Sequence, residues 1–175
     1  ARELLKEAVK IFEANIGEPK VKAQAKYIIR CHCNLANSYT NAHNLQQAGE
    51  LLKEAVEIFK TNIGAPKVRA EAGFIIACHT KLANSYTNAS NLQQAGELLK
   101  EAVKIFEANI GDPKVKAEAE FIITCYINLA NSHTNDNNLQ QAGELLKEAV
   151  EIFKANIDDP KAKAQAEYII RCHNN

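Results

Sequence analysis

The sequence repeats itself every 47 residues. The hexapeptide Leu-Leu-Lys-Glu-Ala-Val begins at Leu4 and returns at Leu51, Leu98 and Leu145. A fixed period of this size is typical of repeat proteins, in which each unit buries its apolar face only by stacking on its neighbours. The period therefore predicts one continuous array over residues 1–175 rather than a globular domain around a single core.

The charge balance of the chain argues against two classes of partner. Lysine plus arginine number 21 and aspartate plus glutamate also number 21, which gives a formal net charge of zero. Proteins that bind nucleic acid or anionic membranes usually carry an excess of positive charge, so we expect neither partner. No stretch approaches the roughly 18 consecutive apolar residues that span a bilayer, and the first residues resemble an amphipathic helix more than a signal peptide. We expect a soluble, cytoplasmic chain that is an excerpt from a longer array.

Each unit contains two apolar stripes at helical spacing. The first stripe runs through Val21, Ala25, Ile28, His32, Leu35 and Tyr39, and the second through Leu45, Ala48, Leu52, Ala55, Phe59 and Ile63. Spacings of three and four residues predict one helix from about residue 20 to 41 and another from 45 to 63. A tight turn at residues 41–43 makes the two helices antiparallel neighbours.

Residues suited to helix ends flank both predicted helices. Gly17, Gly64 and Gly111 can adopt the left-handed conformation that closes the previous helix. The proline two positions after each glycine is suited to the first turn of the next helix. Asn44 stands before the second helix with Gln47 three residues later, which is the capping-box arrangement. The resulting hairpins span residues 20–63, 67–110 and 114–157, with a second helix alone at 1–16 and a first helix alone at 161–175.

The hairpin carries a recognisable pattern of large, small and aromatic residues. In the first unit the pattern consists of Leu35, Ala36, Tyr39, Ala48, Leu52 and Ala55. The second unit repeats it in full, and the third has His133 in place of the tyrosine. This pattern resembles the tetratricopeptide repeat, in a variant longer than the usual unit of about 34 residues. The connection Ile-Gly-x-Pro-Lys-Val is loosely similar to the linker of kinesin-light-chain repeats.

The resemblance implies a fold and a kind of partner. It implies an all-α, right-handed solenoid of stacked antiparallel hairpins, with the first helices on the concave wall. Members of this family usually hold an extended or helical segment of a partner protein on that wall. The expected partner is therefore a protein or peptide.

Differences between the units suggest where a partner would bind. Units 51–97 and 98–144 differ at 13 of 47 positions, and several differences fall on one face of the first helix. Beside them lie Asn and Thr residues that stay constant and could pair with a partner's backbone. Equally, these asparagines could pair between units or cap the first helix, and their identity could simply record a recent duplication of the unit. The candidate contact residues are Arg30, Cys33, Asn34, Asn37, Asn41, Ala77, Thr80, Lys81, Asn84, Asn88, Thr124, Ile127, Asn128, Asn131 and Asn135.

The cysteines predict neither disulfides nor a metal site. Cys31, Cys78, Cys125 and Cys172 share one unit position, so we expect them about 10 Å apart, like packed helices. A disulfide needs alpha carbons within about 7 Å. Cys31 and Cys33 point in different directions from one helix, and neighbouring residues such as His32 and Cys33 cannot converge on one metal. We expect small, buried thiols in a reducing compartment.

Catalytic motifs are missing from the sequence. It contains no glycine-rich phosphate loop, no HExxH pair and no Gly-x-Ser-x-Gly elbow. We therefore expect a chain with no catalytic residues and no cofactor. The favoured function is a scaffold that binds a peptide or helix. The alternative is a structural building block, natural or engineered, that stacks end to end into a homo-oligomer or polymer through apolar faces such as Leu5, Val9, Phe12 and Ile169.

Overall fold

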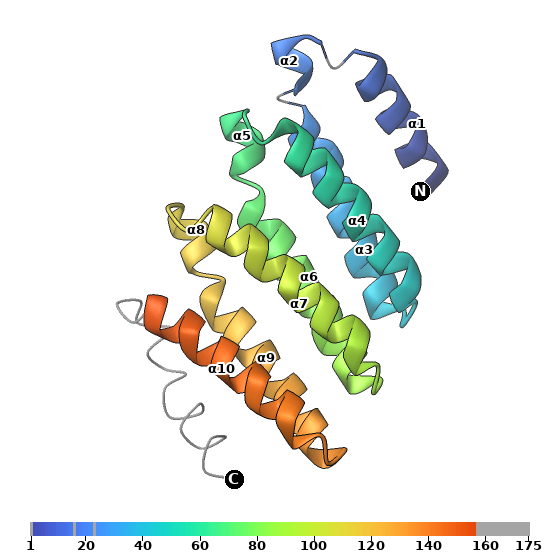
Figure 1. The fold of residues 1–175 in the computed structure, drawn as a ribbon. Helices are drawn as coiled ribbons and strands as arrows, with labels where there is room; N and C mark the ends of the chain where they lie inside the picture. The colour runs from blue at the N-terminus through green and yellow to red at the C-terminus, as the bar shows by residue number, and fades with distance from the viewer. Residues whose placement is uncertain (1, 16, 23, 157–175) are drawn as a thin grey trace.

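The computed structural model describes residues 2–15, 17–22 and 24–156. All of its regular elements in this part of the chain are α-helices (Figure 1). They are α1 (Arg2–Ala14), α2 (Pro19–Lys22), α3 (Ala25–Asn41), α4 (Leu45–Asn62), α5 (Pro66–Arg69), α6 (Ala72–Asn88), α7 (Leu92–Ala108), α8 (Pro113–Lys116), α9 (Ala119–Asn135) and α10 (Leu139–Ala155). The helix expected at 161–175 lies outside the described residues.

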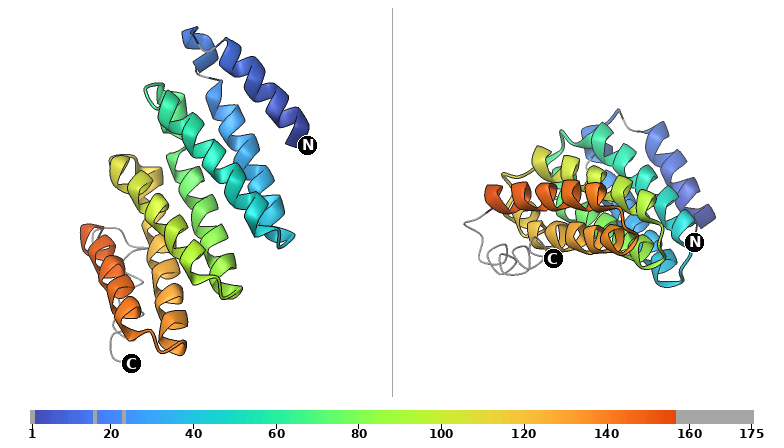
Figure 2. Two further views of the ribbon diagram at one scale, coloured as in Figure 1. Left: turned by 45° about the vertical axis from the view of Figure 1, so that its right-hand side comes forward. Right: turned by 60° about the horizontal axis from the view of Figure 1, so that its bottom comes forward.

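The long helices form antiparallel hairpins that stack side by side. The hairpins are α3–α4, α6–α7 and α9–α10, with α1 placed against α3 (Figures 1 and 2). Neighbouring first helices pack directly, α3 on α6 and α6 on α9, and each second helix also packs on the first helix of the next hairpin. This arrangement confirms the predicted all-α repeat solenoid.

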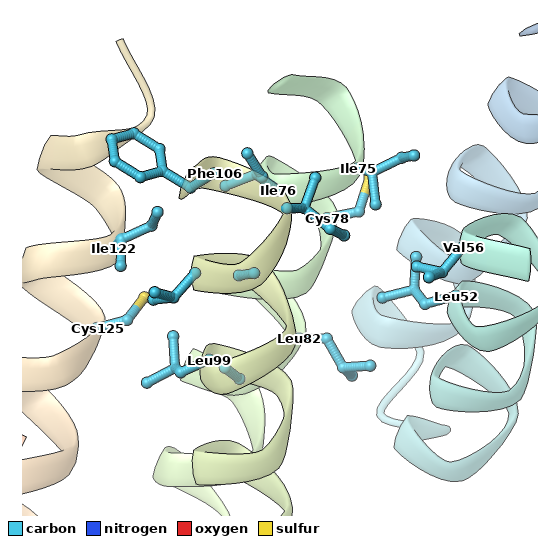
Figure 3. Close-up of a cluster of buried hydrophobic side chains, with 14 of the residues drawn as sticks. Leu52, Val56, Ile75, Ile76, Cys78, Leu82, Leu99, Phe106, Ile122 and Cys125 are labelled. Carbon is cyan, nitrogen blue, oxygen red and sulfur yellow. The ribbon is translucent and has the colours of Figure 1, made fainter. Parts of the chain in front are cut away.

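One apolar core runs through the stack without a break between hairpins. Ile75, Ile76 and Leu82 of the central helix α6 are fully buried, between residues of α4 such as Leu52 and residues of α9 such as Ile122 (Figure 3). Burying a side chain of this size stabilises the fold by about 1.5–3 kcal/mol. Stacking therefore supplies the core that a single two-helix unit cannot build alone.

The tight turn predicted inside each hairpin contains one residue in the left-handed conformation. The residue in the left-handed conformation is His43, Ser90 or Asn137, each with φ between 57° and 59°. In the first turn His43 N–H donates to the Thr40 carbonyl and Asn44 N–H donates to the Tyr39 carbonyl, at 3.0 and 2.8 Å, which is the Schellman pattern. In the connections between hairpins, the prediction that Gly17, Gly64 and Gly111 close the preceding helix in the left-handed conformation was wrong, because no described glycine has positive φ.

The capping boxes are present only in part. The Asn138 side chain accepts a hydrogen bond from the Gln141 backbone N–H at 3.4 Å, whereas the side chains of Asn44 and Asn91 make no capping hydrogen bond. The Schellman turn uses the backbone N–H of each asparagine. The two helices are therefore joined mainly by backbone hydrogen bonds.

The long first helix predicted from residue 20 is divided in the structure. In the second unit a short helix, α5, precedes α6, and Glu71 N–H bonds the Val68 carbonyl at 2.9 Å, three residues back instead of four. That tighter turn changes the chain direction while keeping Val68 fully buried. The predicted proline position is confirmed, since Pro66 and Pro113 begin α5 and α8. The break lets α5 pack on α3, and α8 on α6.

Candidate functional site

A small hollow lies between the first helices of the second and third hairpins. It lies between α6 and α9 and has a volume of about 310 Å³. Its lining residues are Ala77, Thr80, Lys81, Asn84, Phe121, Thr124 and Cys125. Five of them, all except Phe121 and Cys125, were candidate contact residues from the sequence. The structure therefore brings this part of the predicted set together around one concave surface.

The candidate residues differ in how much of each side chain a partner could reach. Arg30, Asn34, Asn41, Lys81, Asn88, Asn131 and Asn135 are exposed, and Asn37, Ala77, Asn84, Thr124 and Asn128 are half-buried. Cys33, Thr80 and Ile127 are buried, so a partner could reach little of these three candidate side chains. Cys33 and Thr80 lie where the next first helix packs, since their carbonyls face the thiols of Cys78 and Cys125. Thr80 still borders the hollow.

The constant asparagines pair partly between units. Asn128 Nδ2 donates to Asn84 Oδ1 at 3.1 Å, and Asn37 Nδ2 donates to Cys78 Sγ at 3.4 Å. The alternative in which these amides link neighbouring hairpins therefore describes Asn37 and Asn84. Asn88 and Asn135, one turn further along their helices, remain exposed.

Arg30 is fixed by its neighbours and is not an isolated charge. Its Nε donates to Glu71 Oε2 at 2.7 Å, and its guanidinium lies 6.0 Å from the centroid of the Phe74 ring. The Glu71 carboxylate is buried beneath this contact. The hydrogen bond with Glu71 raises the pKa of Arg30. This side chain joins the first two hairpins and has little freedom to meet a partner.

An aromatic residue at one position of each unit was missed by the sequence reasoning. Tyr27 and Phe121 are 55% and 53% exposed, and Phe74 at the equivalent position of the middle unit is half-buried next to Arg30. The recurrence of an aromatic residue outside the apolar stripe could have identified them. Phe121 stands at the edge of the hollow and offers the largest apolar surface there.

A second, larger groove lies on the opposite layer, between α4 and α7. Its volume is about 710 Å³, and the side chains of His79 and Tyr86 from α6 line it together with residues of α4 and α7. Lys60 and Glu101 form an ion pair of 2.9 Å across it. Burial lowers the pKa of His79, whose Nδ1 lies 2.9 Å from the Ile75 carbonyl oxygen. Polar and charged groups of both signs therefore surround this groove.

His32 occupies in the first unit the position that His79 occupies in the second, and its surroundings are those of a buried residue that packs between helices. It is buried, with Nδ1 2.9 Å from the Ile28 carbonyl oxygen and Nε2 3.0 Å from Glu54 Oε2. Cys31 is exposed and Cys33 is buried, so they face different sides of α3. Within the described residues no cluster of three or more metal-ligating side chains is present.

The fold and its repeated hairpin define a class, the α-helical repeat proteins. Residues 122–156, which span most of α9 and all of α10, match the family model of the tetratricopeptide repeat. The chain thus carries a tetratricopeptide repeat, and the two preceding hairpins repeat its sequence at intervals of 47 residues. No curated protein matches the chain.

The family sets the general expectation for this chain. Tetratricopeptide repeats generally mediate protein–protein interactions and are typically non-catalytic scaffolds. In the part of the chain that the structure describes, no helix is long and apolar enough to cross a membrane.

Proposed function

We propose that the chain is a non-catalytic scaffold that binds a peptide or helical segment of a partner protein on the face formed by α3, α6 and α9. The observation that carries this proposal is the lining of the hollow between α6 and α9. Positions that differ between units, such as Ala77 and Thr124, border it beside the exposed ring of Phe121. A surface that varies on a constant framework is suited to selecting a partner.

The hollow favours a particular kind of peptide side chain. Its walls are formed largely by small groups, including Ala77 and Thr124, so an apolar side chain of moderate size fits between them and packs on Phe121. Lys81 is exposed at the rim and favours an acidic residue next to that anchor. The exposed amides of Asn88 and Asn135 can hydrogen-bond the peptide backbone.

Selection from a displayed random-peptide library against the full chain tests the proposal. We expect enriched peptides to carry an apolar residue beside an acidic one. Thr124→Arg fills the hollow and should weaken their binding at least tenfold in isothermal titration. Thr61→Arg is the matched control, because Thr61 is exposed on α4 and, like Thr124, its hydroxyl donates to the carbonyl four residues back. Equal losses for both variants, or none for Thr124→Arg, would move the site elsewhere.

A second candidate function is self-assembly by end-to-end stacking of copies. It is favoured by α1, on which Leu4 is 72% and Ile11 62% exposed. The equivalent residues of the later units are buried or half-buried in the stack: Leu51, Leu98 and Leu145 for Leu4, and Ile58, Ile105 and Ile152 for Ile11. A second copy that covers α1 would bury the same apolar positions.

Multi-angle light scattering over a concentration series tests this second candidate. We expect the average mass to rise with concentration, and the double variant Leu4→Glu, Ile11→Glu to remain monomeric. Leu139→Glu is the control, since Leu139 is an equally exposed leucine on another helix, α10. A wild-type chain that stays monomeric at the highest concentration would exclude the assembly.

A further inference from the structure

Two cysteines from different units meet inside the stack. Cys33 of α3 and Cys78 of α6 are both buried where the two helices pack on each other. Cys78 Sγ also lies 4.0 Å from the Cys33 carbonyl oxygen, so the backbone of one residue is close to the side chain of the other. The two cysteines occupy different positions of the unit, because they are 45 residues apart instead of 47. Spacing by the repeat period alone therefore does not predict the pair.

The surroundings of the pair make the two sulfurs chemically different. Asn37 Nδ2 donates a hydrogen bond to the sulfur of Cys78 at 3.4 Å. The nearby Cys33 thiol lowers the pKa of Cys78, as do the hydrogen bond from Asn37 and the positive charge of Lys81, and together they outweigh burial, which raises it. The nearby Cys78 thiol and burial raise the pKa of Cys33. Cys78 is therefore the stronger candidate to react as a thiolate.

The next pair of hairpins provides an internal comparison. The equivalent positions there are Thr80 and Cys125, and Cys125 Sγ donates to the Thr80 carbonyl at 3.4 Å. With a threonine in place of the first cysteine, burial raises the pKa of Cys125 to about 12. The second thiol thus distinguishes the first interface from the second.

We propose that Cys33 and Cys78 are a redox modification site, at which a peroxide forms a reversible disulfide that links the first hairpin to the second. The proposal is independent of the binding function above. It needs no large movement, because the sulfur of Cys78 already lies 4.0 Å from the Cys33 carbonyl oxygen across the contact between α3 and α6.

The reaction proceeds in two steps. The thiolate of Cys78 attacks one oxygen of the peroxide, the O–O bond breaks, and the sulfur becomes a sulfenic acid as hydroxide leaves. The sulfur of Cys33 then attacks the sulfenic sulfur, which forms the S–S bond and expels the oxygen as water after the Cys33 proton is transferred to it. In total two thiols and one hydrogen peroxide give one disulfide and two waters. A dithiol reverses the change by thiol–disulfide exchange.

Access to the pair and its effect both involve Asn37. Its half-buried amide hydrogen-bonds the sulfur of Cys78, and we expect rotation of this side chain to admit a small oxidant. A disulfide sulfur is a weaker hydrogen-bond acceptor than a thiolate, and oxidation releases the amide of Asn37. The modification therefore fixes the two hairpins together and frees a polar group beside Cys78.

Peptide mapping of the native, full chain tests the proposal. The Cys31→Ser variant serves as the background, because exposed Cys31 would otherwise link separate chains. The reduced protein is treated with hydrogen peroxide, blocked, digested with trypsin and analysed by mass spectrometry without reduction. We expect a linked pair of peptides that contain Cys33 and Cys78, lost on adding dithiothreitol, and a melting midpoint several degrees higher in the oxidised protein.

Two further variants separate this pairing from chance oxidation. Cys33→Thr copies the second interface and should abolish both the linked peptides and the rise in melting midpoint. Thr80→Cys places a thiol opposite Cys125 and should create a second link between α6 and α9. Oxidation of Cys78 to sulfinic acid without a link, linkage only through other cysteines, or no reaction of the folded chain at excess peroxide would each overturn the proposal.

Discussion

At the residue scale, the left-handed position of each hairpin turn is occupied by a residue other than glycine. His43, Ser90 and Asn137 have φ near 58°, where a β-carbon is close to the following carbonyl oxygen. Asparagine tolerates this conformation better than serine or histidine, so the third turn is the least strained of the three. Because these are surface turns, the cost can be relieved without disturbing the core.

Replacing Ser90 with glycine should therefore stabilise the protein. We expect a gain of about 0.5–1 kcal/mol in the free energy of unfolding, since the relief of left-handed strain exceeds the added entropy of the unfolded chain. Urea denaturation followed by circular dichroism measures it. Ala89→Gly is the control, because Ala89 has φ −87° and should only lose stability. A gain for Ala89→Gly as large as that for Ser90→Gly would contradict the explanation.

Burial of His79 predicts a dependence of stability on pH. Its pKa is lowered in the folded state, so the unfolded chain binds the proton more readily below about pH 6.5. Stability is fully present above that pH and is lost as the pH falls through it. We expect the free energy of unfolding to decrease between pH 7 and pH 5, with a slope approaching one proton for this group. His79→Gln should remove that part of the slope; an unchanged slope would assign it to other groups.

At the element scale, two glycines in long helices differ in how closely a neighbouring helix approaches them. A β-carbon on Gly73 of α6 would lie 3.2 Å from the Lys114 carbonyl oxygen of α8, whereas one on Gly96 of α7 would meet only Leu129 at 3.9 Å. The first contact exists because the short helix α8 packs on α6. Both glycines are helical, but only Gly73 serves a close approach of two backbones.

Replacing each glycine with alanine should therefore change the stability of the protein differently at the two sites. Gly96→Ala should stabilise the protein by about 0.5–1 kcal/mol, because alanine loses less entropy in a helix and ordinary space is present. Gly73→Ala should yield no such gain, since the backbone of α8 must shift. Thermal denaturation of the two variants measures the difference. Equal gains would show that α8 moves away at no cost.

At the scale of the whole molecule, stability depends on how many neighbours each hairpin has. The hairpin α6–α7 is packed on both sides, by α3–α4 and by α9–α10, whereas α1 contacts α3. In a linear array the free energy is close to a sum of unit terms and nearest-neighbour contacts. The units should therefore open at different free energies and not in one step.

Hydrogen exchange followed by mass spectrometry tests this order. We expect the slowest exchange in α6 and α7 and the fastest in α1. Ile122→Ala removes a fully buried side chain of α9 and should cost about 2–4 kcal/mol, with faster exchange in α9 and α10 than in α3 and α4. Uniform acceleration across all hairpins would indicate that the array unfolds as a single unit.

Much of the hairpin could be predicted from the sequence, because it depends on short-range spacing. The apolar stripes identified both long helices, and Leu52, Ala55 and Phe59 are buried as their stripe requires. The candidate site was predicted less well. Thr124 and Lys81 do border the hollow, but Cys33 and Ile127 are buried, since a helix face shows its exposure only once its neighbours are placed.

What the sequence determined by itself is the unit: a 47-residue period, two antiparallel helices, and the apolar faces that must stack. What only the tertiary structure decided is the stagger between units. Contacts between them join Cys33 with Cys78, Asn84 with Asn128 and Lys60 with Glu101, which are 45, 44 and 41 residues apart. The reason is physical, because the period fixes equivalent positions, whereas the packing of one helix against another fixes which unlike positions touch. The buried cysteine pair and the hollow between α6 and α9 both arise from that stagger.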